Sequence, residues 1–224
     1  MTNLKAYFAA ARREMVEQIS HHTNAVSDRL GISSLTEQVT EVMEKVPRHE
    51  FVPVELQIYA YLDQPLPIGF GKTISQPFIV ALMTDLLDLQ MQDRVLEIGT
   101  GLGYQAAILA NLAKEIYSIE IIEELARQAK NKLDRLGYRN IDLKIGDGSS
   151  GWPEHSPFNK IIVTAAPELI PVALLQQLKP GGKMVIPAGL EDSQQLIVAK
   201  KDKDGSITTK EILPVRFSSL TITH

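Results

Sequence analysis

From residue 94 onward, short apolar runs alternate with longer amphipathic segments, and this alternation limits the possible folds most strongly. Five runs are predicted strands: 94–98, 115–120, 141–146, 159–164 and 182–187. Three segments between them are predicted helices: 104–113, 122–136 and 168–178. Strands separated by helices favour a parallel sheet covered on both faces, with right-handed crossovers. The chain is therefore predicted to be an α/β protein.

The end of the chain departs from this alternation. Two β-rich runs, 194–202 and 206–217, are separated only by turn-forming residues, with no helix between them. This arrangement predicts an antiparallel hairpin. A mostly parallel sheet that finishes in such a hairpin is the outline of the Rossmann-like class I methyltransferase fold, and it differs at this end from the dinucleotide-binding fold.

The first part of the chain has a different pattern. Apolar residues recur at helical spacing within 1–62, which predicts an N-terminal helical cap in which the polar stretch 21–31 is irregular. A helix is expected to begin at Ser33 or Ser34 and to end before Pro47. We expect one domain over 1–224, made of the cap (1–62), a substrate loop and helix (63–90) and a Rossmann-like core (91–224).

Residues 63–75, DQPLPIGFGKTIS, contain two prolines and two glycines, which predict a loop without regular structure. A helix is expected to follow over 77–89. Long loops beside a regular scaffold often bring backbone groups and small side chains to a ligand. A plain connector is the alternative interpretation of the same residues.

Composition excludes several classes of function. With no cysteine, the chain forms no disulfide, thiolate metal site or cysteine nucleophile, and its histidines lack metal-ligand spacing, so no metal is expected. The formal net charge of -4 gives no overall attraction to nucleic acid or anionic lipid. No apolar run approaches the roughly 18 residues of a membrane span, and the N-terminus does not resemble a signal peptide, so a cytoplasmic protein is expected.

A glycine loop follows the first strand of the core. The strand 94–98 runs directly into Gly99, Gly101 and Gly103, and a predicted helix begins there. Glycines allow a tight strand-to-helix turn and let a ligand approach the backbone amides at the helix start. Glu97 precedes them and completes E-x-G-x-G-x-G, the form found in S-adenosylmethionine-dependent methyltransferases. We expect Glu97 and these glycines to bind the cofactor.

The same loop also satisfies the dinucleotide-binding pattern. Gly101, Gly103 and Ala106 match G-x-G-x-x-G/A, and Glu120 follows about 20 residues further on, where a ribose-binding acid is expected. A nicotinamide-dependent oxidoreductase is therefore an alternative. Glu97 favours the methyltransferase, because a dinucleotide enzyme has no comparable need for that acid.

Two acids follow the next two strands. Glu120 ends the second strand, where its carboxylate can accept hydrogen bonds from both ribose hydroxyls. Asp147 follows the third strand, next to Gly148, and is expected to hold the adenine amino group. A solvent-exposed glutamate and a plain aspartate–glycine turn are the structural alternatives.

Five segments carry a resemblance to a known family, protein-L-isoaspartate(D-aspartate) O-methyltransferase. The segment TISQP is specific to this family, whereas the glycine loop and LKPGG occur in many methyltransferases. The resemblance extends from about residue 35 to the end of the chain. Its segments are VPRHEFVP (46–53), YLDQPLPIGFGKTISQPFIVALM (61–83), VLEIGTGLGYQAAILA (95–110), GDGSSGWPEHSPFNKIIVTAAP (146–167) and LKPGGKMVIP (178–187).

The resemblance implies methyl transfer from S-adenosylmethionine to the free α-carboxylate of L-isoaspartyl residues in damaged proteins and peptides, with S-adenosylhomocysteine as product. Ser75 resembles the active-site serine, and it is also predicted to cap the following helix. Two nearby residues are expected to contact cofactor or substrate through their backbone: Thr73 and Ile74. Further substrate-binding residues are expected to be Asp63, Ile68, Gly69, Thr164, Ala165 and Ala166.

The chain departs from the family pattern at several positions. Lys72 stands where glutamine is usual, Asn159 replaces an aspartate, and Ser218 and Ser219 replace a valine and a proline. Two further alternatives therefore stay open: a methyltransferase for another carboxylate or small molecule, and a non-catalytic reader of isoaspartyl ends. A monomer is favoured.

Overall fold

The computed structural model describes residues 2–221. It contains two compact units, Met1–Asp85 and Leu86–His224. No helix within the described residues is long and apolar enough to cross a membrane. The interpretation of the chain as a single domain stays a prediction.

The first unit is mainly helical, as predicted. Its elements are α1 (Thr2–Ala25), α2 (Ser27–Leu30), α3 (Glu37–Lys45), η1 (Arg48–Phe51), η2 (Val54–Tyr59), β1 (Leu66–Gly69), β2 (Lys72–Ile74) and α4 (Pro77–Leu87), whose last two residues belong to the second unit. The stretch 21–31 is helical rather than irregular, because α1 continues through the buried Thr23, whose hydroxyl donates to the Ile19 carbonyl at 2.9 Å. The prediction for that stretch was wrong.

The start of α3 also differs from the prediction. The helix begins after Thr36 rather than at Ser33 or Ser34. The backbone amide and the hydroxyl of Thr36 both donate to Asp85 Oδ1, at 2.9 Å and 2.7 Å. A carboxylate 49 residues away in the sequence therefore determines where this helix begins.

The loop 63–75 contains a small antiparallel sheet, so the prediction that it has no regular structure was wrong. Leu66 in β1 lies opposite Ile74 in β2, and Pro67 lies opposite Thr73. Both strands are edge strands, where proline's missing amide hydrogen is tolerated. The reversal between them uses positive φ angles at Gly69 (+93°), Phe70 (+55°) and Gly71 (+67°). The glycines thus form the turn of a hairpin.

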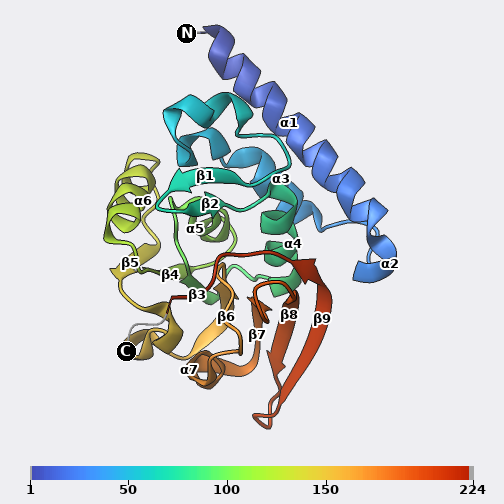
Figure 1. Ribbon diagram of the computed structural model, residues 1–224, viewed down its shortest axis with the longest axis vertical. Helices are drawn as coiled ribbons and strands as arrows, with labels where there is room; N and C mark the ends of the chain where they lie inside the picture. Colours follow the sequence, from blue (N-terminus) through green and yellow to red (C-terminus); the bar gives the residue numbers. More distant parts are fainter. Residues whose placement is uncertain (1, 222–224) are drawn as a thin grey trace. The chain divides into compact units, whose positions relative to one another are not determined.

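The second unit has the predicted α/β order (Figure 1). Its elements are β3 (Arg94–Ile98), α5 (Tyr104–Ala110), β4 (Glu115–Glu120), α6 (Glu123–Arg135), β5 (Ile141–Ile145), η3 (Gly148–Ser150), η4 (Pro153–His155), β6 (Phe158–Val163), α7 (Val172–Gln177), β7 (Leu178–Ala188), β8 (Gln194–Lys201) and β9 (Ile207–Val215). The helix predicted over 168–178 is shorter, because the chain enters α7 in an extended conformation at Pro171.

The seven strands form one sheet in the order β5-β4-β3-β6-β7-β8-β9. The first five in this order are parallel to one another, and β8 is antiparallel to both β7 and β9. This is the predicted mostly parallel sheet with a C-terminal antiparallel hairpin. The Rossmann-like class I methyltransferase architecture is therefore confirmed.

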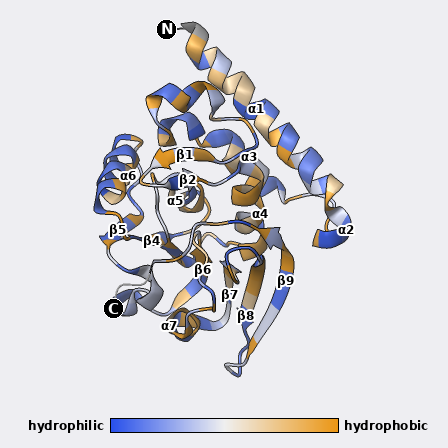
Figure 2. Ribbon diagram, viewed as in Figure 1, coloured by the Kyte–Doolittle hydropathy of each residue, from blue (hydrophilic) through white to orange (hydrophobic). Residues whose placement is uncertain are grey.

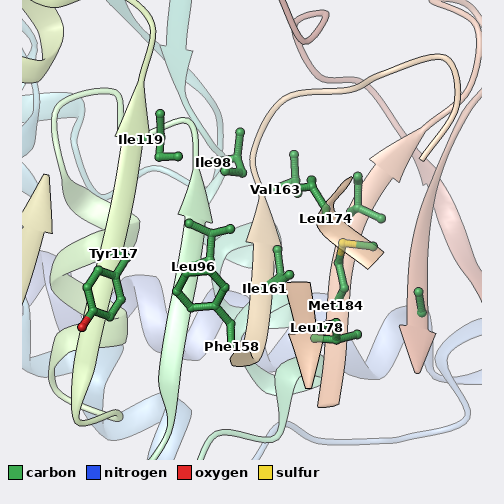
Figure 3. Close-up of a cluster of buried hydrophobic side chains, with 12 residues drawn as sticks. Leu96, Ile98, Tyr117, Ile119, Phe158, Ile161, Val163, Leu174, Leu178 and Met184 are labelled. Carbon is green, nitrogen blue, oxygen red and sulfur yellow. The ribbon is translucent and has the colours of Figure 1, made fainter. Parts of the chain in front are cut away.

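Apolar side chains cover the sheet of the second unit on both faces. One face carries Leu96, Tyr117 and Ile161, and Leu174 of α7 packs against the same cluster (Figure 3). Successive residues of a strand point to opposite faces. The alternate residues Val95 and Ile116 are fully buried too, so the other face is also covered.

The helix α6 is amphipathic. Leu125, Ala129 and Leu133 are buried along one side, while Lys130 and Asp134 form an exposed pair one turn apart at 3.0 Å. Figure 2 shows the corresponding mixture of blue and orange residues on α6. The helix contacts β4 and β5, and it thereby supports the strand ends that carry the acids.

Candidate functional site

The glycine loop begins where β3 ends. Gly99 has φ of +93°, a conformation that favours glycine. A side chain on Gly99 would also collide with Thr164 Oγ1. That hydroxyl donates to the carbonyls of Ile98 at 3.1 Å and of Gly99 at 2.7 Å. Thr164, at the end of β6, therefore fixes the turn out of β3.

The last glycine of the loop positions α5. Gly103 is the N-terminal flanking residue of α5 with φ of +96°, and a Cβ there would lie 3.2 Å from Leu133 Cδ1. Gly103 thus allows close packing of the helix start against α6. Its own amide donates to the Thr100 carbonyl at 2.9 Å, so this amide is paired within the loop.

Glu120 is buried at the end of β4, and its carboxylate joins two backbone segments. Oε2 accepts from the Gly101 amide at 2.8 Å, and Oε1 accepts from the Ile122 amide at 3.0 Å. Since a carboxylate has about four acceptor sites, each oxygen can still accept from a further donor. Glu120 is thus fixed against the glycine loop and can accept hydrogen bonds from ribose hydroxyls.

Glu97 is fully buried on β3 and belongs to a chain of side chains. The Ser118 hydroxyl donates to Glu97 Oε2, and Thr100 Oγ1 lies 2.6 Å from Ser118 Oγ. Because Ser118 has one proton, and that proton goes to Glu97, Thr100 must donate to Ser118. Burial raises the pKa of Glu97 to about 8; the Ser118 hydrogen bond opposes this shift, and the charge of Glu120 adds to it.

Ser118 and Thr100 were not among the predicted site residues. Ser118 lies directly opposite Glu97 in the β3–β4 pairing, so their side chains share one face of the sheet. One signal was available, because Ser118 is a small polar residue between the apolar residues of β4. The strand order that makes the two residues neighbours came only from the structure.

Asp147 lies in an aspartate–glycine turn, which was the structural alternative to a role in adenine binding. Its Oδ1 accepts from the Ser149 amide at 2.8 Å and caps η3. Gly148 lies tightly against β3, since a Cβ there would collide with Ile98 Cγ2. The contact of Asp147 with an adenine amino group stays a prediction.

Small residues follow β6 at the same edge of the sheet. Thr164 and Ala165 are half-buried and Ala166 is buried. The Ala166 amide donates to the Ser218 carbonyl at 2.8 Å, and the Leu220 amide donates to the Ala166 carbonyl at 2.8 Å. The C-terminal segment therefore pairs with this edge through its backbone, which does not require the valine and proline that Ser218 and Ser219 replace.

Asn159, which replaces the aspartate of the family pattern, has a structural role. Its Oδ1 accepts from the Arg94 amide at 3.0 Å and joins the beginnings of β6 and β3. A carboxylate oxygen at this position can accept the same bond. The replacement of aspartate by asparagine therefore preserves the contact.

In the first unit, Asp63 holds the start of α4. Its Oδ1 accepts from the Phe78 amide at 2.8 Å, and its Oδ2 accepts from Gln76 Nε2 at 2.9 Å. The Nδ1 of His22 lies 3.0 Å from the same Oδ2. The prediction that Ser75 caps α4 was wrong, because Asp63 accepts the amide that a cap at Ser75 would bind.

The other loop residues lie on the hairpin β1–β2. Ile68 and Ile74 are buried, Thr73 is exposed, and Lys72 is half-buried. Ser75 follows the hairpin directly and is half-buried.

The predicted site residues fall into two groups, one in each unit. The first unit contains six of them: Asp63, Ile68, Gly69, Thr73, Ile74 and Ser75. The second unit brings the remainder to the carboxyl ends of β3, β4, β5 and β6: Glu97, Gly99, Gly101, Gly103, Glu120, Asp147, Gly148, Thr164, Ala165 and Ala166.

The second unit fits S-adenosylmethionine, the cofactor that the resemblance implies. Glu97 Oε1 is buried and has no hydrogen-bond partner among the described residues. A buried carboxyl oxygen without a partner is costly, so it suits a ligand whose polar group pairs with it. Glu120 adds ribose-binding capacity. Within residues 2–221, no group of three or more His, Asp or Glu side chains could hold a metal ion.

Comparisons with known proteins point to one family. A protein-L-isoaspartate O-methyltransferase 1 of Polaromonas sp. (strain JS666 / ATCC BAA-500) is 62% identical over 213 residues, 95% of this chain and 90% of the relative. A solved protein-L-isoaspartate O-methyltransferase matches 91% of this chain and 65% of its own at 29% identity, with a TM-score of 0.77.

A second solved structure, from Plasmodium falciparum, is a putative protein-L-isoaspartate O-methyltransferase in complex with S-adenosyl-L-homocysteine. It matches 94% of this chain and 98% of its own at 23% identity and a TM-score of 0.77, which supports the fold. The family model for protein-L-isoaspartate(D-aspartate) O-methyltransferase matches residues 22–224. The chain therefore belongs to the protein-L-isoaspartate(D-aspartate) O-methyltransferase family.

Proposed function

We propose that this protein is a repair methyltransferase that uses S-adenosylmethionine to methylate the free α-carboxylate of L-isoaspartyl residues in proteins and peptides. Membership of the family over residues 22–224 is the observation that carries the proposal. The fold and the glycine loop agree with it. A nicotinamide-dependent oxidoreductase loses its support, because the antiparallel end of the sheet and Glu97 both belong to the methyltransferase pattern.

S-adenosylmethionine supplies an electrophilic methyl group on a positively charged sulfonium. The substrate carboxylate is ionised at neutral pH and needs no general base to act as nucleophile. The protein must therefore align the two reactants and exclude water. Because opposite charges disappear in the transfer, stabilisation of a new charge matters less.

In the second unit, we assign cofactor binding to Glu97, Gly99, Gly101, Gly103, Glu120, Asp147 and Gly148. Glu120 accepts from the ribose hydroxyls while its two backbone contacts hold it in place. Thr164, Ala165 and Ala166 leave room for the peptide beside the edge of the sheet.

In the first unit, we assign substrate orientation to Ser75, whose hydroxyl donates to the substrate carboxylate. Thr73 and Ile74 contribute backbone contacts to cofactor or substrate, and Ile68 and Gly69 contact the peptide. Asp63 acts by holding the loop, as its contacts with Gln76 and Phe78 support.

Repair follows without further catalysis. Esterification gives the carbonyl a methoxy leaving group, so the neighbouring backbone nitrogen attacks that carbonyl, closes a succinimide and releases methanol. Hydrolysis of the succinimide restores aspartate in part of the molecules. We also propose a cytoplasmic, monomeric protein of one domain, with no nucleic-acid or membrane partner.

The test is transfer of labelled methyl from S-adenosylmethionine to a synthetic isoaspartyl peptide, with the aspartyl isomer as the matched control. Selective labelling of the isoaspartyl peptide is expected. Calorimetric binding of the cofactor without labelling of either peptide would instead indicate another acceptor or a non-catalytic reader. Labelling of both isomers alike would exclude isoaspartyl repair as the specific function.

A further inference from the structure

A histidine of α1 contacts the carboxylate of Asp63, the first residue of the loop 63–75. His22 is 41 residues from Asp63 in the sequence, yet its Nδ1 lies 3.0 Å from Asp63 Oδ2. Because a carboxylate oxygen accepts, the proton of this hydrogen bond is on Nδ1. The His22 ring also stacks on Phe78, with centroids 3.9 Å apart and planes inclined by 10°. His22 is thus held by both its edge and its face.

Asp63 connects this contact to the start of α4. Its oxygens accept from the Phe78 amide and the Gln76 side chain, the two groups that flank Pro77. Ser75 immediately precedes Gln76, so the backbone that carries its hydroxyl is joined to this cluster. Within the described residues His22 makes no hydrogen bond to Ser75, so its action passes through Asp63.

We propose that His22 is a positioning residue for methyl transfer, which orients Asp63 and thereby fixes the backbone at Ser75 for the substrate carboxylate. This inference rests on the proposed function and extends it to α1. The physical reason is that donors from α1 and from the start of α4 hold the Asp63 carboxylate together, which fixes both its position and its orientation. Without His22, Asp63 loses one of its donors and can rotate away from the geometry that aligns Ser75, so its contact with the Phe78 amide weakens, and small misplacements cost rate.

Four variants separate the parts of this contact. His22→Phe keeps an aromatic ring over Phe78 and removes the donor, whereas His22→Gln keeps a donor and removes the ring. His22→Ala removes both. His21→Ala is the matched control, because His21 is the exposed neighbour on the same helix. The variants are compared by kcat and KM for the isoaspartyl peptide and by calorimetric affinity for S-adenosylhomocysteine.

We expect His22→Phe and His22→Ala to lower kcat about tenfold, with S-adenosylhomocysteine affinity within about twofold of wild type. His22→Gln should recover most of the activity. In the Ser75→Ala background, His22→Phe should have little further effect, because residues acting through one contact are not additive. Wild-type kcat in His22→Phe, or a full additional loss in the double variant, would overturn the proposal.

Hydrogen exchange separates this outcome from failure of the proposed function. Exchange at the Phe78 amide should be about tenfold faster in His22→Phe, whereas exchange at the Thr40 amide of α3 should stay unchanged. Unchanged exchange at Phe78 would refute the positioning role even in an active enzyme. If wild type methylates no isoaspartyl peptide, the proposed function fails, and the positioning role of His22 in methyl transfer fails with it.

Discussion

The buried Glu97 gives a quantitative prediction about stability. Burial raises its pKa from 4.5 to about 8. In the folded protein the carboxyl therefore keeps its proton over a range where the unfolded chain has lost it. Folding must take up a proton between these two pKa values, so the free energy of unfolding falls as pH rises through this window. Below the lower value both states are protonated, and the contribution is fully present.

The size of the effect follows from the shift. Each pH unit within the window costs about 1.4 kcal/mol, so a rise from about pH 5.5 to about pH 7.5 should remove roughly 3 kcal/mol of stability through this group alone. Glu97→Gln has no proton to bind and loses this pH dependence. Its amide oxygen can still accept from Ser118, while its amide nitrogen adds a pH-independent cost of about 1–3 kcal/mol if unpaired.

The assay is urea unfolding without cofactor at several pH values for wild type, Glu97→Gln and the exposed control Glu191→Gln. The stability difference between wild type and Glu97→Gln should change by roughly 3 kcal/mol across the window in favour of the variant as pH rises. The control should follow wild type. Parallel curves for wild type and Glu97→Gln would show that Glu97 is ionised in the folded protein. That result would refute the raised pKa of Glu97.

Three further predictions concern predicted site residues of the two units. Glu120→Ala should weaken S-adenosylhomocysteine binding about ten- to a hundredfold by calorimetry, because charged hydrogen bonds are lost; unchanged affinity would contradict its assignment. Ser75→Ala should lower kcat at least about tenfold while cofactor affinity stays constant, and wild-type turnover would remove its role. Gly99→Ala should cost about 2–4 kcal/mol in urea unfolding through its positive φ and the collision with Thr164. Thr164→Ala should cost less in the Gly99→Ala background than in wild type, because it relieves the collision, and additive losses would argue against the collision.

The local pattern was sufficient for the core of the second unit. The predicted strands 94–98 and 115–120 coincide with β3 and β4, and the glycine loop and Glu120 lie where the strand ends place them. Periodicity and turn chemistry act over a few residues, so they can be read directly from a sequence. The antiparallel end of the sheet was predictable for the same reason.

Contacts between distant segments required the tertiary structure. Asp85 determines the start of α3, Ser118 lies opposite Glu97, and His22 reaches Asp63.

The sequence by itself determined the α/β order, the glycine loop and the acids at the strand ends, because short-range periodicity encodes them. Only the tertiary structure decided that residues 66–74 pair as a hairpin and that His22 of α1 contacts the Asp63 carboxylate. Strand pairing and carboxylate partners depend on which segments meet in space. Their energy comes from groups tens of residues apart, which no local pattern records.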